Sequence, residues 1–251
     1  MTDHTVSSIE SLRLDVDGQG VHYLKAGSGP PLVLLHGGTS DSQDWTETLD
    51  ALSHSYTVYA PDMIGYGQSD SSKDSYCLSD FVAFTQRFIQ KLELAHPALV
   101  GHSLGGRICL ELALRHPELL HSLVLVDTAG FGRLAWWGTL LAATAFGVRR
   151  FLRRPQPFPK LAREEGEDRS WRCDDRLPSL KLSTLVVWKR RDPYFSLAGA
   201  LKAVKLIPKV RLEVFSGWGH APHKAQPLAF NNLLLEFLDN NQPHPSNRPL
   251  F

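Results

Sequence analysis

The sequence has few of the features that mark disulfide-bonded, metal-binding or nucleic-acid-binding proteins. It contains three cysteines in 251 residues, namely Cys77, Cys109 and Cys173, and no Cys-x-x-Cys or Cys/His cluster. Because their number is odd and they lie far apart, we expect neither a disulfide framework nor a metal site. The 27 Lys and Arg residues nearly balance the 26 Asp and Glu residues, so the net charge does not indicate a nucleic-acid partner.

Long apolar segments and nucleotide-binding motifs are also missing. Residues 1–12 carry charges and serines but no apolar stretch, so we expect no signal peptide. The longest uncharged apolar stretch, 134–148, is too short to span a bilayer comfortably. The chain has neither G-x-x-x-x-G-K-[ST] nor a strand-linked G-x-G-x-x-G, so no phosphate-binding loop is predicted. We therefore expect a cytoplasmic protein without a cofactor, whose length suits one large domain.

What the sequence does contain is a regular alternation of predicted strands and helices. Apolar and charged residues alternate over 12–24 around a glycine-containing turn, which predicts a hairpin. Short apolar runs then predict buried strands, and apolar residues at helical spacing predict helices between them. This order predicts an α/β fold with a mostly parallel sheet and helices on both faces. The predicted strands are 31–38, 56–60, 98–100, 121–127, 183–188 and 210–215, and the helices are 44–53, 79–92 (capped by Ser79 and Asp80), 107–114, 197–206 and 228–238.

The most informative stretch is a G-x-S-x-G turn formed by Gly101, His102, Ser103, Leu104 and Gly105. It follows a predicted strand and precedes a predicted helix. Such a rapid reversal strains the central residue, and side chains at the flanking glycines would collide as strand and helix close together. The turn exposes the Ser103 hydroxyl above the sheet edge, at a helix N-terminus that favours negative charge. An acyl-transfer nucleophile needs this placement.

This strand–turn–helix arrangement resembles the nucleophile elbow of the α/β-hydrolase family, and the resemblance covers nearly the whole chain outside 131–178. It implies an eight-stranded, mostly parallel sheet with a helical cap inserted after the sixth strand. The strand pattern breaks at Gly130, segment 131–163 has seven basic and no acidic residues, and 164–178 has six acidic residues. We therefore predict a core formed by 1–130 and 179–251 and a cap formed by 131–178.

The family orders its catalytic residues as Ser, then Asp or Glu, then His, each in a loop that follows a strand. Asp192 and His220 each follow a predicted strand, in that order after Ser103. The resemblance therefore assigns Ser103 as the nucleophile and His220 as the general base and acid. Asp192 is then the carboxylate that orients His220.

Three residues leave alternatives open around this assignment. Asp127 ends the predicted strand 121–127, and some relatives supply the catalytic carboxylate from that strand. His223 lies close to His220 and is the alternative histidine. Lys189 stands where the family often has glycine, a departure that can shift the loop before Asp192 without removing the acid.

The resemblance also implies an oxyanion hole. Two backbone N–H groups stabilise the negative charge that develops on the carbonyl oxygen. One is the N–H of Leu104, the residue after the nucleophile, and the other is that of Gly38, in the loop 36–38 where the predicted strand runs into glycines. His36 is then expected to hold this loop, and His102 is expected to pack or to form a hydrogen bond away from the reacting bond.

The predicted cap carries Trp136, Trp137 and Leu140 in an uncharged stretch. In a cap this pattern predicts the roof of an apolar acyl or aromatic pocket. Four arginines follow at 149–154, and this combination also fits an anionic membrane surface or an anionic substrate. A solvated cap helix is the favoured interpretation.

These features predict a cofactor-free serine hydrolase that cleaves a carboxylic ester or lactone of small to medium apolar character. The same triad serves carbon–carbon bond hydrolases of aromatic degradation, which often carry Asn where this chain has His102, and it serves haloperoxidase-like perhydrolysis. Dehalogenases and epoxide hydrolases of the fold use an aspartate nucleophile, so Ser103 argues against both. A receptor that keeps the hydrolase fold is the remaining alternative. We expect a small-molecule substrate, no nucleic-acid partner, and a monomer or homodimer.

Overall fold

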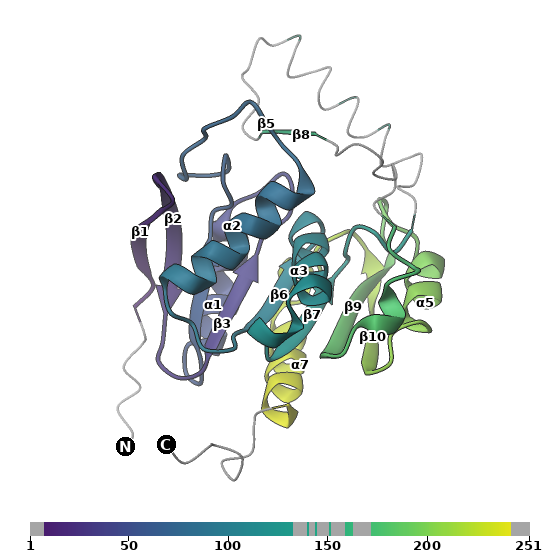
Figure 1. The fold of residues 1–251 in the computed structure, drawn as a ribbon. Coiled ribbons are helices and arrows are strands. Elements are labelled where there is room, and N and C mark those ends of the chain that lie inside the picture. The colour runs from purple at the N-terminus through teal and green to yellow at the C-terminus, as the bar shows by residue number, and fades with distance from the viewer. Residues whose placement is uncertain are drawn as a thin grey trace, which may run out of the picture.

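The computed structural model describes residues 8–132, 140, 144, 151, 159–162 and 172–241 (Figure 1). Most of the predicted cap, including Trp136 and Trp137, lies outside the described residues. Leu140 is described, and its side chain is half-exposed. The boundaries of the cap at 131 and 178 therefore stay a prediction.

A sheet of eight strands forms the centre of the molecule. Its strands are β1 (Glu10–Val16), β2 (Gln19–Ala26), β3 (Pro31–Leu35), β4 (Thr57–Pro61), β6 (Ala98–His102), β7 (Ser122–Val126), β9 (Ser183–Arg191) and β10 (Val210–Trp218). They lie in the order β1-β2-β4-β3-β6-β7-β9-β10. The pairings β1–β2 and β2–β4 are antiparallel, and all the others are parallel. The prediction of an eight-stranded, mostly parallel sheet is confirmed.

Helices cover both faces of this sheet and enclose two apolar cores (Figure 1). On one face lie α2 (Leu78–Lys91), α3 (Leu104–Arg115) and α5 (Leu197–Val204), which bury residues such as Phe88 and Ile108. On the other lie α1 (Thr46–Leu52) and α7 (Pro227–Asn240), which bury residues such as Leu49 and Phe230. The central strands β6 and β7 are buried along their whole length because both of their faces are covered, and most of their residues are apolar.

The structure corrects three local predictions. Helix α2 begins one residue before Ser79: its N-cap is Cys77, and Asp80 is the residue whose carboxylate accepts the Cys77 N–H at 2.9 Å. A short helix, α6 (Pro222–Ala225), precedes α7 and was not predicted. Two-residue strands β5 (Ser75–Tyr76) and β8 (Lys160–Leu161) pair in parallel, although no strand was predicted within 131–178. Segments this short carry no periodic signal.

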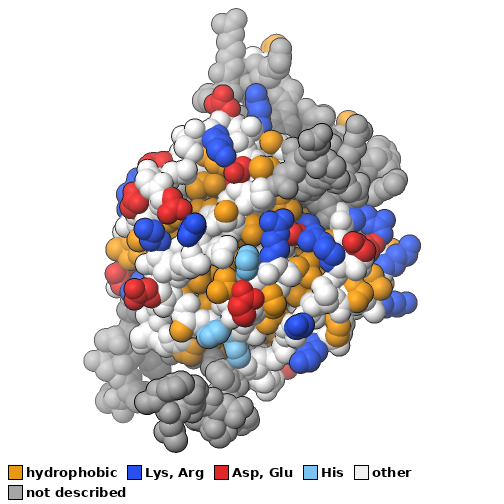
Figure 2. Space-filling model, in the orientation of Figure 1, with side chains coloured by type: hydrophobic (Ala, Val, Ile, Leu, Met, Phe, Trp, Pro, Cys, Tyr) orange, Lys and Arg blue, Asp and Glu red, His pale blue; other side chains and the backbone are white. Residues whose placement is uncertain are grey.

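The topology places the candidate site residues at one edge of the sheet. Strands β3, β6, β7, β9 and β10 run parallel, so their carboxyl ends lie together. The loops at these ends, together with the first residue of α3, contain all of the predicted catalytic and oxyanion residues. No helix among the described residues is long and apolar enough to cross a bilayer. Acidic and basic side chains both occur on the face drawn in Figure 2.

Candidate active site

The backbone at Ser103 is strained in the way that the G-x-S-x-G turn predicts. Ser103 lies between β6 and α3 with φ +53° and ψ −112°, a conformation that costs of order 1–3 kcal/mol for a residue with a side chain. The flanking glycines allow the close approach: a Cβ at Gly101 would lie 2.4 Å from the Gly105 carbonyl oxygen, and a Cβ at Gly105 would lie 2.4 Å from the Leu35 carbonyl oxygen. The Ser103 N–H also donates to the Val126 carbonyl at 2.9 Å, which fixes the turn to β7.

Asp192 and His220 form a hydrogen-bonded pair. His220 Nδ1 lies 2.7 Å from Asp192 Oδ2. The second carboxylate oxygen, Oδ1, accepts the N–H groups of Tyr194 at 2.7 Å and Phe195 at 3.1 Å. The Asp192 side chain is fully buried, whereas that of His220 is 16% exposed. Three donors thus hold the carboxylate, and His220 Nε2 has no hydrogen-bond partner among the described residues.

Ser103 and His220 lie in two loops that are connected through His102. Within the described part of the chain, Ser103 Oγ and His220 Nε2 are not hydrogen-bonded to each other. Catalytic hydrogen bonds are often long in ligand-free enzymes and shorten when substrate binds. The residue before Ser103 links the two loops, because His102 Nε2 lies 2.5 Å from the His220 carbonyl oxygen. A carbonyl oxygen can only accept, so Nε2 carries the hydrogen and Nδ1 carries a lone pair.

Burial keeps His102 neutral. Burial, followed by the nearby His220, lowers the pKa of His102 to about 3. An uncharged imidazole that donates to a main-chain carbonyl is a positioning group, in agreement with the predicted hydrogen-bonding role of His102.

Asp127, the rival carboxylate, lies close to Asp192 in a different electrostatic environment. One of its oxygens accepts the Lys189 N–H at 2.7 Å, and the other has no hydrogen-bond partner among the described residues. Burial and the neighbouring Asp192 raise its pKa well above the usual range, although Lys189 opposes the shift. The raised pKa favours the neutral form of Asp127 and so makes it a poorer source of the negative charge that stabilises an imidazolium.

Lys189 itself is a buried lysine beside this carboxyl group. It is only 2% exposed, and its Nζ donates to the Ser216 carbonyl at 2.8 Å. Lys189 lies within β9, which runs to Arg191 and ends directly before Asp192. Lys189 is thus part of the strand, and the acid lies directly after the end of that strand.

The two predicted oxyanion donors lie on adjacent segments. A Cβ built on Gly38 would lie 3.3 Å from Leu104 Cδ2 and 3.5 Å from Leu104 Cβ, so the two backbones are in close proximity. Leu104 is the first residue of α3, where N–H groups lack partners within the helix. Neither N–H donates to another residue in the described part of the chain. Both donors are available to an oxygen atom of a ligand.

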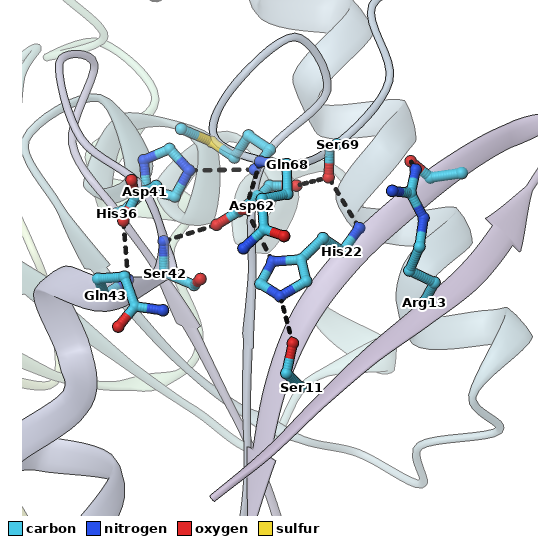
Figure 3. A network of polar contacts seen from close by, with 12 residues as sticks. Ser11, Arg13, His22, His36, Asp41, Ser42, Gln43, Asp62, Gln68 and Ser69 are labelled. Carbon is cyan, nitrogen blue, oxygen red and sulfur yellow. Dashed lines mark hydrogen bonds and ion pairs between the residues drawn. The ribbon is translucent and has the colours of Figure 1, made fainter.

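A buried polar network holds the loop that carries Gly38 (Figure 3). His36 Nδ1 lies 2.8 Å from the Gly37 carbonyl oxygen, and its Nε2 accepts the Met63 N–H at 3.0 Å. Burial lowers the pKa of His36, so the ring stays neutral and keeps one donor and one acceptor. Both ring nitrogens of His36 are therefore used within the loop network, which agrees with the predicted loop-holding role.

Asp62 is the centre of this network, and sequence reasoning missed it. One oxygen accepts the Ser42 N–H at 2.7 Å, and the other accepts the Gln68 N–H and lies 2.8 Å from His22 Nδ1 (Figure 3). Burial would raise the pKa of Asp62, but these hydrogen bonds lower it below its usual range. Gly67 has φ +51°, and a Cβ there would lie 2.2 Å from Asp62 Oδ2. The glycine-rich sequence 65–69 was the available signal.

Two groups of three side chains in the described residues bring potential metal-ligand atoms within 4.8 Å of one another. One group is Asp127, Asp192 and His220, whose proximity follows from the hydrogen bond between Asp192 and His220 described above. The other group contains His223, the alternative catalytic histidine. His223 is 2% exposed and stacks on Trp45 with ring centroids 4.2 Å apart. Asp192 bonds to His220 and not to His223, so the geometry favours His220 as the base.

Comparisons with known proteins agree with this architecture. The family model described as alpha/beta hydrolase fold matches residues 30–161. The chain is 30% identical over 250 residues to 2-hydroxymuconate semialdehyde hydrolase of Pseudomonas sp., with 85% of this chain and 88% of that protein covered. Among solved structures, the carboxylesterase CesB of Bacillus subtilis superposes with a TM-score of 0.83 at 22% identity, covering 94% of this chain and 93% of that one. A meta-cleavage product hydrolase of Pseudomonas fluorescens gives 0.76 at 25% identity, covering 93% and 99%.

Proposed function

Because this chain belongs to the α/β-hydrolase fold family, we propose that it is a serine hydrolase that cleaves a carboxylic ester or lactone through an acyl-enzyme on Ser103. One observation carries this proposal. The strained Ser103 elbow lies beside a histidine that is bonded to Asp192 through Nδ1, while its Nε2 has no partner in the described part of the chain. A free Nε2 is what a general base needs.

In the first half-reaction, His220 Nε2 takes the proton from Ser103 Oγ as the oxygen attacks the carbonyl carbon of the ester. The carbonyl oxygen becomes an oxyanion, and the carbon becomes tetrahedral. When the carbon–oxygen bond to the alcohol breaks, the alcohol oxygen takes the proton back from Nε2. Asp192 stabilises the imidazolium between these two transfers.

The second half-reaction repeats these steps with water. Water gives a proton to His220 Nε2 and attacks the acyl carbon. The bond from the acyl carbon to Ser103 Oγ then breaks, Oγ regains its proton and the carboxylic acid leaves. In both halves, the N–H groups of Gly38 and Leu104 stabilise the oxyanion. Removing one donor of this kind typically lowers kcat by about 10²–10³-fold.

A second candidate is the hydrolysis of a carbon–carbon bond next to a ketone. The similarity to 2-hydroxymuconate semialdehyde hydrolase supports it, since it extends over 85% of this chain. The chemistry has the same requirements for a base and an oxyanion hole. The ester reaction remains our first choice because His102 stands where such enzymes often carry Asn.

The test is hydrolysis of p-nitrophenyl esters of increasing acyl length by the wild-type protein and by Ser103→Ala. We expect repeated turnover by the wild type and a loss of at least about 10⁴-fold in the variant. Ser216→Ala is a matched control, because Ser216 is exposed and uses only its backbone carbonyl in the contacts described. Full activity in Ser103→Ala overturns the proposal.

Assays on the same protein preparation distinguish the ester hydrolase from the carbon–carbon bond hydrolase and from a receptor. Consumption of 2-hydroxymuconate semialdehyde without ester turnover, again dependent on Ser103, selects the carbon–carbon bond reaction. A single reaction event per chain, with no further cycles on any substrate, selects the receptor. The substrate pocket predicted at Trp136, Trp137 and Leu140 is tested by the dependence of kcat/KM on acyl length.

A further inference from the structure

Three side chains that the proposed reaction does not use as acid, base or nucleophile converge near Ser103 and His220, since one of them, His102, precedes Ser103 and bonds to the His220 carbonyl. Asp44 lies in the short 3-10 helix η1 (Ser42–Trp45), His102 ends β6, and His223 lies in α6. One ligand atom from each lies within 4.8 Å of the other two. These residues come from three distant parts of the sequence, and the topology of the sheet brings them together.

The two histidines have ring nitrogens without partners. Among the described residues, no hydrogen bond reaches His102 Nδ1, His223 Nδ1 or His223 Nε2, and the two residues are 7% and 2% exposed. A buried polar atom left unpaired costs about 1–3 kcal/mol, so each such atom needs an explanation, such as an ion or an ordered water. Because His102 Nε2 donates to the His220 carbonyl, the unpaired Nδ1 presents a lone pair.

We propose that Asp44, His102 and His223 bind a divalent transition-metal ion of the zinc class. Two neutral imidazoles and one carboxylate form a ligand set typical of zinc, with the fourth position left to water. The His102 ring is held as metal-ligating histidines usually are, since its other nitrogen donates to a backbone carbonyl. Burial lowers the pKa of both histidines, which keeps both rings neutral and able to coordinate.

The space next to His102 is consistent with this assignment. Zinc–nitrogen distances of about 2.0–2.1 Å place tetrahedral ligand atoms about 3.3 Å apart, so the three donors must approach one another by at most about 1.5 Å. A Cβ at Gly37 would lie 2.9 Å from His102 Nδ1, so the glycine leaves this nitrogen accessible. Trp45 stacks on His223 and fixes the plane of its ring.

One neighbouring group opposes a cation. Lys224 Nζ lies 2.5 Å from Asp44 Oδ1, and this ion pair competes with a metal for the carboxylate. Burial would raise the pKa of Asp44, but the hydrogen bonds from Lys224 and Ser40 lower it, so the carboxylate is ionised. A carboxylate has about four lone-pair sites and can hold both partners. Removing the lysine charge should therefore tighten metal binding.

The experiment is a titration of the chelator-treated full-length protein with Zn²⁺, followed by calorimetry and by metal analysis after gel filtration. We expect one ion per chain. His223→Phe keeps an aromatic ring against Trp45, and Asp44→Asn keeps the shape of the carboxylate. Each should weaken binding by at least about 100-fold, since loss of even an outer-shell partner costs 10–100-fold in metal affinity. His54→Ala, at an exposed histidine, is the control and should bind like the wild type.

Two further measurements make the outcome decisive. Lys224→Gln should bind Zn²⁺ several-fold more tightly than the wild type. Co²⁺ in place of Zn²⁺ should give the intense visible absorption of a tetrahedral site in the wild type and lose it in Asp44→Asn. Absence of stoichiometric binding by the wild type, or equal binding by the wild type and both ligand variants, overturns the proposal. The unpaired nitrogens would then be satisfied by water.

Discussion

Two histidine–aspartate pairs in this molecule have nearly the same Nδ1–carboxylate distance but differ in the partners and the exposure of the histidine ring. His220 Nδ1 lies 2.7 Å from Asp192, and His22 Nδ1 lies 2.8 Å from Asp62. In the second pair, Ser11 Oγ lies 2.9 Å from His22 Nε2, and the ring is 3% exposed. In the first pair, Nε2 has no partner among the described residues and the ring is 16% exposed.

The two pairs differ in whether Nε2, the ring nitrogen that does not face the carboxylate, has a hydrogen-bond partner. We call the His22–Asp62 pair saturated and the His220–Asp192 pair open. Every polar atom of the His22 ring is occupied, so this pair can only hold β2 against the loop after β4 (Figure 3). The His220 ring keeps one nitrogen for a proton in transit. A hydrogen-bonded pair is therefore a catalytic candidate only if its outer nitrogen is both unpaired and reachable.

The largest expected effect comes from removing the charge of the open pair. Asp192→Asn should lower kcat for the ester reaction by about 10⁴-fold, because the amide cannot hold His220 in the required tautomer or stabilise its cation. The free energy of unfolding should change far less than the activity. Steady-state kinetics and urea unfolding of one preparation measure both. Activity within 10-fold of the wild type would mean that Asp192 does not serve His220.

The same substitution in the saturated His22–Asp62 pair should act mainly on the free energy of unfolding. Asp62→Asn replaces an ionised acceptor of three hydrogen bonds with a group that can donate as well. We expect a loss of about 3 kcal/mol in the free energy of unfolding, equivalent to about 100-fold in the folding equilibrium. Urea unfolding measures this loss. Ser11→Ala, which removes only the exposed end of the pair, is the matched control and should cost less than about 1 kcal/mol.

A third carboxylate, Glu111, tests whether a fully hydrogen-bonded acid stabilises the fold when its partners are arginines and not a histidine. Glu111 pairs with Arg107, Arg115 and Arg176 at 2.7–2.8 Å. Burial would raise the pKa of Glu111, but the arginines lower it from 4.5 to about 2. The resulting stabilisation is therefore fully present above pH 4.5 and is lost as the pH falls towards 2.

We expect this contribution to be about 2 kcal/mol, because Arg115 and Arg176 are partly exposed and solvent screens them. Urea unfolding at pH 5 and pH 3 should show a steeper loss of stability for the wild type than for Glu111→Gln, which cannot titrate at this position. Parallel losses in the two proteins would assign the acid sensitivity to other groups.

Local motifs made much of the site predictable from the sequence. The elbow at Ser103 is defined by adjacent glycines, and the strand pattern put Asp192 and His220 after strands in the expected order. The His22–Asp62 pair was not predictable, because its partners are 40 positions apart and no spacing rule connects them. The convergence of Asp44, His102 and His223 was missed for the same reason, and the sequence led us to expect no metal site.

The raised pKa of Asp127 was also not predictable from the sequence, and it leads to the smallest expected effect. Asp127 and Asp192 have the same side chain near the same histidine, but Asp192 has three donors and Asp127 has one. Burial and the neighbouring Asp192 raise the pKa of Asp127, which favours its neutral form, and a neutral carboxyl group is close in charge and shape to an amide. Asp127→Asn should therefore change kcat by less than about 3-fold between pH 6 and pH 8, where Asp192→Asn loses about 10⁴-fold. The two variants differ only in which carboxylate is replaced, so their ratio identifies the acid. A large loss in Asp127→Asn would show that the charge on Asp127 takes part in the reaction, and the unpaired oxygen would then have to move towards His220 when substrate binds.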